Sequence, residues 1–190
     1  MDDILVFAKT LEELNQRTKA VMDVMEAQEL HLKPEKCQFQ KQQIEFLGLV
    51  ITPKGVDTES GKVKAILEWL PPKNLKGLQQ FLGFANYYRT FIEGYSHIVM
   101  PLTNLTRKNV PFIWDEQCNA AMGQLKMAFA TKPILRIYDW KLPTVLETDA
   151  SYYAMGAVLL QKQLEDDKWH PGAYRSQAFN GSEQNYDVHD

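Results

Sequence analysis

The first residues of the chain show a strand pattern followed by a helix pattern. Residues 4–7 form an unbroken apolar run, Ile-Leu-Val-Phe, which is too short for a helix and predicts a buried strand. Thr10 followed by Glu13 fits a capping box, in which each side chain accepts a hydrogen bond from the other residue's backbone amide at the start of a helix. Apolar residues then recur at three- and four-residue steps, so we expect a helix that ends near residue 28.

Strand patterns continue beyond this helix. Residues 30–32 and 37–39 alternate apolar and polar positions and predict two short strands around a turn at 34–36. Residues 44–51, Ile-Glu-Phe-Leu-Gly-Leu-Val-Ile, predict one stronger strand. The glycine inside it, Gly48, indicates a bulge or a close approach of another backbone.

From residue 57 the apolar spacing becomes helical. Asp57 or Thr58 can cap a first helix, and Asn74 can cap a second. A third helical segment follows Pro101, and Asp115 can cap a fourth that ends before Pro133.

The last part of the chain returns to strand patterns. Residues 144–148, 155–161 and 169–174 are expected to be strands, with a polar hairpin turn at 165–168 between the last two. The order is therefore sheet, helices and sheet again, which predicts an α+β fold.

Composition excludes several classes of protein. Of the 190 residues 45% are hydrophobic, enough to supply the core of one large domain or two small ones. The longest apolar run, Ala154–Leu160, has seven residues against the ~20 that span a bilayer, so we expect no membrane partner. The acidic start, Met1-Asp2-Asp3, lacks the features of a secretion signal, so we expect an intracellular protein. Cys37 and Cys118 lack the spacing of a disulfide framework or a zinc site.

Charge differs between the two parts of the chain. Residues 1–112 carry 14 Lys and Arg against 13 Asp and Glu, whereas residues 113–190 carry 7 against 11. This difference indicates two modules with different roles, although neither is basic enough to argue for nucleic-acid binding by itself.

Two sets of carboxylates are candidates for metal chemistry. Asp2 and Asp3 directly precede the predicted strand 4–7, and Asp149 ends the apolar strand that begins near residue 144. Carboxylates at such positions can hold Mg²⁺ through hard oxygen ligands. The structural alternatives are a solvated terminus for the aspartate pair and, for Asp149, a turn in which its side chain accepts hydrogen bonds from the next amides.

An aromatic segment, residues 84–91, could combine stacking and charge against a nucleic-acid backbone. Packing in the core is the more frequent use of such residues. We expect Tyr88 to lie in the core, and Tyr87 and Arg89 to be free to contact a partner.

Five blocks of the sequence, taken in their order along the chain, resemble the polymerase polyprotein of Gypsy-type long-terminal-repeat retrotransposons. They are similar to the end of the reverse transcriptase YxDD box, the end of the palm, a primer-positioning hairpin, the thumb and the opening of an RNase H domain. The blocks are residues 1–7, 32–39, 46–48, 81–92 and 147–159.

The resemblance implies a domain order and residue roles. It implies a palm end at 1–56, thumb and connection helices at 57–112, and the start of an RNase H-like domain at 113–190. Asp2 would be a catalytic metal ligand with Asp3 as its acidic neighbour, and Asp149 the first RNase H carboxylate. Each centre would use two Mg²⁺ ions. The residues implied to contact a primer–template or RNA–DNA hybrid are Phe46, Leu47, Gly48, Tyr87 and Arg89.

The family pattern also contains residues that this chain lacks. The resemblance places a further palm aspartate upstream of Asp2, and a second RNase H carboxylate, a glutamate, beyond Asp190. One carboxylate cannot hold two Mg²⁺ ions against their hydration and mutual repulsion. We therefore expect a segment truncated at both ends, with neither active site complete within it.

Two hypotheses follow from this comparison. The chain is a reverse transcriptase/RNase H segment that is inactive in isolation, or it is a non-catalytic remnant that binds nucleic acid or another protein. Apolar faces of 4–7 and 44–51 left exposed would favour self-association.

Overall fold

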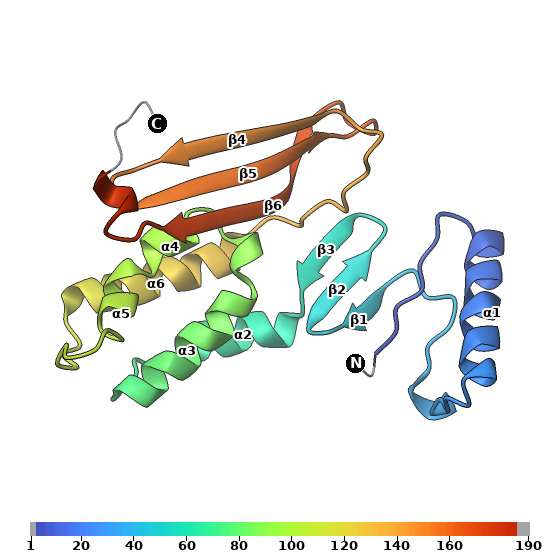
Figure 1. Cartoon of the computed structure of the whole chain (residues 1–190), viewed down its shortest axis with the longest axis horizontal. Coiled ribbons are helices and arrows are strands. Elements are labelled where there is room, and N and C mark those ends of the chain that lie inside the picture. The colour runs from blue at the N-terminus through green and yellow to red at the C-terminus, as the bar shows by residue number, and fades with distance from the viewer. Residues whose placement is uncertain (1–2, 186–190) are drawn as a thin grey trace.

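The first helix of the computed structural model, which describes residues 3–185, starts where the sequence predicts. Helix α1 (Leu11–Ala27) begins after Thr10, whose side chain accepts a hydrogen bond from the Glu13 amide at 3.2 Å. The Glu13 carboxylate pairs with Arg17 one turn later, so only one half of the capping box forms. Figure 1 shows α1 at one end of the molecule, and none of its residues is buried among the described part of the chain.

Three of the predicted strands are wrong. Residues 4–7, 30–32 and 37–39 form no ladder within the described residues. A strand needs a neighbour whose amides and carbonyls match its own, and an apolar pattern does not supply one. The Phe7 carbonyl instead accepts a hydrogen bond from the Arg17 side chain at 2.7 Å. The turn between the other two segments is confirmed as the short helix η1 (Pro34–Lys36).

The predicted strand 44–51 is an antiparallel hairpin. Strands β1 (Ile44–Phe46) and β2 (Leu49–Thr52) pair with Phe46 opposite Leu49. The two residues between them, Leu47 and Gly48, have φ of 51° and 76°, the backbone that a tight type I′ turn requires.

A third strand, β3 (Gly55–Thr58), completes this sheet in the order β1-β2-β3. The sequence assigned Asp57 or Thr58 to a helix cap, which is wrong because both belong to β3. The next helix, α2 (Ser60–Glu68), begins after Glu59.

Two of the predicted helix caps in the middle of the chain are confirmed. The Asn74 side chain accepts from the Gly77 amide at 2.9 Å, and the Asp115 side chain accepts from the Cys118 amide at 2.8 Å. The remaining helices are α3 (Leu75–Tyr87), η2 (Arg89–Phe91), α4 (Tyr95–Ile98), α5 (Met100–Asn104) and α6 (Glu116–Thr131).

These helices enclose the core. Helices α3 and α6 contribute half of its buried side chains, with η2, α4 and α5 closing it around them. The core residues of α3 and α6 are Leu78, Phe81, Ala85, Cys118, Ala121, Met122, Leu125 and Phe129. The helical spacing of the sequence predicted this face of α6.

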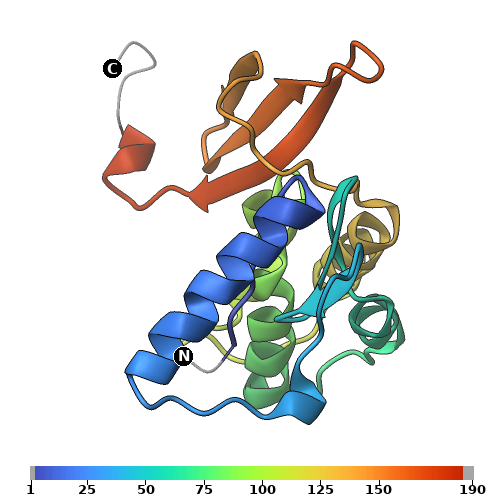
Figure 2. The same cartoon turned by 90° about the vertical axis from the view of Figure 1, so that its right-hand side faces the viewer.

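The second sheet confirms the predicted strands of the last sixty residues, each slightly longer than expected. Strands β4 (Thr144–Ala150), β5 (Ala154–Lys162) and β6 (Trp169–Ala178) pair antiparallel in that order, and η3 (Glu183–Asn185) follows. Strand β6 packs on α4, where the Ser96 amide donates to the Ser176 hydroxyl at 2.8 Å. Figures 1 and 2 show this sheet as a separate layer over the helices, with β4 at its outer edge.

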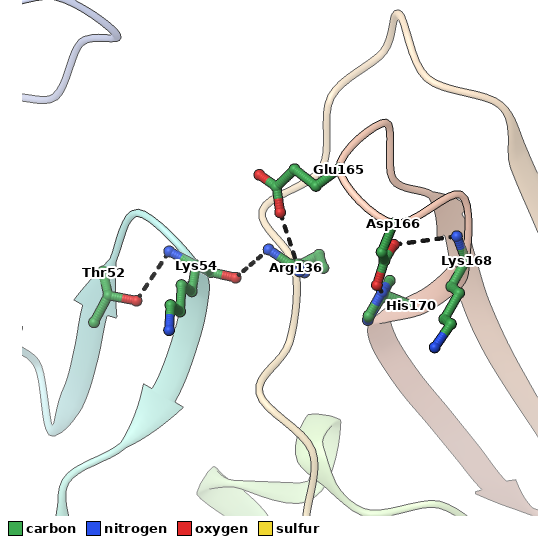
Figure 3. Close-up of polar contacts among 7 residues, drawn as sticks. All are labelled: Thr52, Lys54, Arg136, Glu165, Asp166, Lys168 and His170. Carbon is green, nitrogen blue, oxygen red and sulfur yellow. Dashed lines mark hydrogen bonds and ion pairs between the residues drawn. The ribbon is translucent and has the colours of Figure 1, made fainter.

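The segment between α6 and β4 ties the two sheets together. Leu135 and Val56 of β3 exchange backbone hydrogen bonds at 2.9 and 2.7 Å, and the Arg136 amide donates to the Pro171 carbonyl of β6 at 2.8 Å. The Arg136 side chain donates to the Lys54 carbonyl at 3.0 Å and lies 3.5 Å from the Glu165 carboxylate (Figure 3). One residue therefore touches the β2–β3 turn, the β5–β6 turn and β6.

The α+β fold is as predicted from the sequence. The division at residues 56 and 112 stays a prediction, although β3 runs across the first of these boundaries. No helix within residues 3–185 has the length and apolar character needed to cross a membrane.

Candidate nucleic-acid interface and carboxylates

The hairpin turn and the end of α3 lie against each other. The Tyr87 hydroxyl donates a hydrogen bond to the Leu47 carbonyl at 2.6 Å, and the Tyr88 hydroxyl donates to the Gly48 carbonyl at 3.4 Å. The structure thus brings Tyr87 to the predicted hairpin residues Phe46, Leu47 and Gly48, although 40 residues separate the two segments. Tyr87 is 55% exposed and Leu47 57% exposed, so this junction forms part of the surface.

Tyr88 connects the junction to the core, as its predicted burial implies. Its ring packs against Phe84 and Phe129, with centroids 5.6 and 6.3 Å away. Burial raises the pKa of the Tyr88 phenol, with smaller contributions from Tyr87 and Glu59. The hydroxyl therefore stays protonated and remains a donor. The sequence predicted the position of Tyr88 but not this hydrogen bond, because nothing local links the segments.

Arg89 provides the charge beside the junction. It begins η2 directly after Tyr88, it is exposed, and its guanidinium has no hydrogen bond or ion pair with the rest of the described chain. The exposed side of α3 leading to it is open at Gly83, where a Cβ would meet nothing within 4 Å. The candidate residues thus include an open helix face, an aromatic ring and a cation without an acidic partner in the described chain.

Asp149 lies in the sheet rather than in a turn. It is in β4 opposite Gly156, it is exposed, and Glu147 lies two residues earlier on the same face. The next turn is held by Ser151: its amide donates to the Ala154 carbonyl at 2.9 Å, and its hydroxyl accepts from the Ala154 amide at 3.2 Å. The alternative role for Asp149, capping that turn, is therefore not seen, and its carboxylate is unengaged within residues 3–185.

The carboxylates predicted at the start of the chain are only partly visible. Asp2 lies outside the described residues, and Asp3 is exposed at the beginning of the extended segment. Within the described part of the chain, no three His, Cys, Asp or Glu side chains gather in a way that could hold a metal ion. The described residues by themselves thus do not fit a pair of Mg²⁺ ions, and the metal roles of Asp2 and Asp149 stay predictions.

A large open cavity lies between α1 and the first sheet. Its volume is about 850 Å³. Asp3, Phe46 and Leu47 line it together with the apolar side of α1 and the loop around Cys37. The sequence predicted exposed apolar faces at residues 4–7 and 44–51, which contribute to this lining, but no pattern indicated a cavity between these segments and α1.

Known families match both parts of the chain. A family model described as reverse transcriptase (RNA-dependent DNA polymerase) matches residues 1–51, and one described as an RNase H-like domain found in reverse transcriptase matches residues 114–190. The chain is 38% identical over all 190 residues to the transposon Tf2-3 polyprotein of Schizosaccharomyces pombe, and 37% identical to the Tf2-7 polyprotein. The chain is a reverse transcriptase/RNase H segment of a retrotransposon polyprotein.

This retrotransposon segment spans 14% of the length of those polyproteins. The predicted Gypsy-type resemblance is confirmed by the same match. The segment also shares its fold with the foamy viral protease-reverse transcriptase in complexes with double-stranded DNA and with an RNA/DNA hybrid. The TM-scores are 0.76 and 0.75 at 23% identity, covering 95% and 94% of this segment and 38% and 24% of the viral chains.

Proposed function

We propose that this segment binds a primer–template or RNA–DNA hybrid duplex across the Leu47–Gly48 turn and the end of α3. This binding would serve RNA-directed DNA synthesis coupled to cleavage of the RNA strand. The observation that carries the proposal is the hydrogen bond from Tyr87 to Leu47, which joins the predicted hairpin and the predicted thumb residues into one surface.

Charge and chemistry at this surface suit a duplex backbone. Arg89 is exposed and lacks an acidic partner in the described residues, so its guanidinium can pair with a phosphate without first breaking an ion pair. Tyr87, two residues earlier in the chain, offers a partly exposed ring. The solved structures that share the fold hold double-stranded DNA or an RNA/DNA hybrid, which supports the same class of ligand.

The proposed catalytic contribution is limited to a part of the carboxylate set of each centre. Asp149 would be the first RNase H carboxylate, and Asp2 with Asp3 the aspartate pair of the polymerase centre. Mg²⁺ bound at complete centres would activate the primer hydroxyl or water and stabilise the leaving group. Because no ligand cluster forms among the described residues, we assign no reaction step to this segment alone.

A binding titration tests the proposal. We expect a fluorescently labelled RNA–DNA hybrid to bind with an affinity that falls as salt rises, because phosphate contacts release counterions. Arg89→Ala should weaken binding and reduce the slope of log affinity against log salt by about 1. Arg107→Ala is the matched control, since Arg107 is equally exposed but follows α5. Binding without salt dependence, or equal losses in both variants, would refute the proposed surface.

Activity assays test the incomplete centres. We expect the isolated segment with Mg²⁺ to extend no primer and to cleave no hybrid RNA. Templated incorporation of nucleotides by the purified chain, absent from an Asp2→Asn variant, would show that the polymerase centre is complete.

A second candidate function, self-association, rests on the open cavity and its rim. Ile4 lines the cavity and is 58% exposed, Phe7 three residues later is 68% exposed, and α1 buries no residue. Apolar surface of this kind favours contact with a second chain. We propose that the segment self-associates through this face, which light scattering over a concentration series tests: a constant monomer mass would exclude it.

A further inference from the structure

The Leu47–Gly48 turn is strained at Leu47. Its φ of 51° lies in the left-handed region, which bulky residues with a Cβ rarely adopt. Such strain persists only where surrounding contacts over-determine the conformation, and it tends to occur at functional sites. We therefore infer the role of the turn from the contacts that hold Leu47 in this conformation.

Both carbonyls of this turn are held from outside the hairpin. The Leu47 carbonyl accepts from Tyr87 at 2.6 Å, while the Gly48 carbonyl accepts from the Tyr88 hydroxyl at 3.4 Å and from the Glu59 amide at 3.3 Å. Gly48 also allows this approach, because a Cβ there would lie 2.8 Å from the Tyr88 hydroxyl oxygen.

The two tyrosines form a rigid support. Their rings meet edge to face with centroids 4.8 Å apart, and the Tyr88 ring is 4% exposed. Through its contact with Phe129, Tyr88 ties the turn to α6 as well as to α3. A shift of the helical core would thus be transmitted to the hairpin.

We propose that Tyr87 and Tyr88 are positioning residues, whose hydroxyls hold the strained Leu47–Gly48 turn so that the hairpin and the end of α3 move as one unit on the nucleic acid. The inference rests on the proposed nucleic-acid-binding function of this turn. The sequence predicted that Tyr87 contacts the nucleic acid directly, whereas this inference gives it a positioning role. Its hydroxyl is already bonded to Leu47, so it acts on the ligand through the turn.

Amide hydrogen exchange of the free chain tests the coupling directly. Tyr87→Phe removes only the hydroxyl, and we expect the Phe46 and Leu49 amides, which face each other across the turn, to exchange about three- to tenfold faster. Tyr138→Phe is the matched control, because Tyr138 is 56% exposed and its hydroxyl has no partner in the described chain. Unchanged exchange in Tyr87→Phe would overturn the inference.

A double-mutant cycle tests the link to strain. Leu47→Gly relieves the left-handed conformation, so Tyr87→Phe should accelerate exchange less in that background than in the wild type. Tyr88→Phe, judged by the same amides, provides a second variant if Tyr87→Phe alters the fold. Equal acceleration in both backgrounds would show that Tyr87 does not act by holding the strained residue.

Hybrid binding separates the inference from the proposed function. We expect Tyr87→Phe to weaken binding about threefold or more with an unchanged salt slope, because it removes no charge, whereas Arg89→Ala removes a cation and lowers the slope. If the wild-type chain binds no nucleic acid, the proposed function fails while the exchange result still decides the coupling. If it binds and Tyr87→Phe loses affinity while the Phe46 and Leu49 amides exchange as in the wild type, Tyr87 is a direct contact and the positioning role is refuted.

Discussion

At the scale of single residues, Gly55 has the least freedom to change. Its φ is 140°, and a Cβ at this position would lie 2.1 Å from the Leu135 carbonyl oxygen. That oxygen accepts the hydrogen bond from Val56, so it cannot move without breaking the bridge between β3 and the segment after α6. Glycine is therefore required both by conformation and by space.

Gly55→Ala should destabilise the chain by about 3 kcal/mol or more, because it combines an unfavourable φ with a backbone clash. Gly83→Ala is the control: Gly83 lies inside α3 with open space around it, so we expect the variant to be stabilised by about 0.5–1 kcal/mol. Urea unfolding measures both free energies. Similar values for the two variants would contradict the close approach at Gly55.

At the scale of elements, helix starts are specified locally and strands are not. Thr10, Asn74 and Asp115 were identified as caps from the sequence, and each accepts the expected amide hydrogen bond. A cap needs only residues within one turn, so the sequence shows the whole interaction.

Folding stability should depend on pH at the start of α6, because the residue that caps this helix is a carboxylate. The hydrogen bond from the Cys118 amide holds the pKa of Asp115 below its usual range. The ionised cap therefore stabilises the fold above the usual aspartate pKa, and this contribution is lost as the pH falls through the lowered value. Asp115→Asn keeps an acceptor that does not titrate, so the difference in unfolding free energy between wild type and variant should shrink on acidification. A difference independent of pH would exclude this role for Asp115.

The strands of the first part of the chain were predicted poorly, whereas those of the second sheet were predicted correctly. Residues 4–7 have a strand pattern but no ladder, and the predicted strand 44–51 is broken at Leu47, a residue whose type does not indicate a left-handed turn. The candidate site shows the same division. The family resemblance predicted that Leu47, Tyr87 and Arg89 contact nucleic acid, but the hydrogen bond from Tyr87 to Leu47 crosses 40 residues and has no local pattern.

At the scale of the whole molecule, the segment from Lys132 to Arg136 fixes one sheet against the other. Lys132 pairs with Asp57 of β3 and lies over the Phe91 ring at 5.6 Å. Leu135 pairs with Val56, and Arg136 reaches the β2–β3 and β5–β6 turns (Figure 3). These five residues, together with the packing of β6 on α4 and η2, set the placement of Asp149 relative to the Leu47–Gly48 turn.

Arg136→Gln should loosen this connection. Because the variant loses the side-chain bond to Lys54, we expect the amides of Val56 and Leu135 to exchange about three- to tenfold faster. Arg175→Gln on β6 is the matched control, since Arg175 is exposed and its side chain is unpaired in the part of the chain that the structure describes. Equal exchange in both variants would show that the backbone bridge holds the sheets without Arg136.

The two cysteines differ in exposure and reactivity, so a label on one of them can report on the occupancy of the cavity beside α1. Cys118 is 2% exposed, and burial, followed by its contact with Asp115, raises the pKa of its thiol, so it reacts slowly with alkylating reagents. Cys37 lines the cavity and is only partly covered. A maleimide dye should consequently label Cys37 alone without any engineering. Its emission would then report, in real time, whenever another polypeptide or a duplex fills the space next to it.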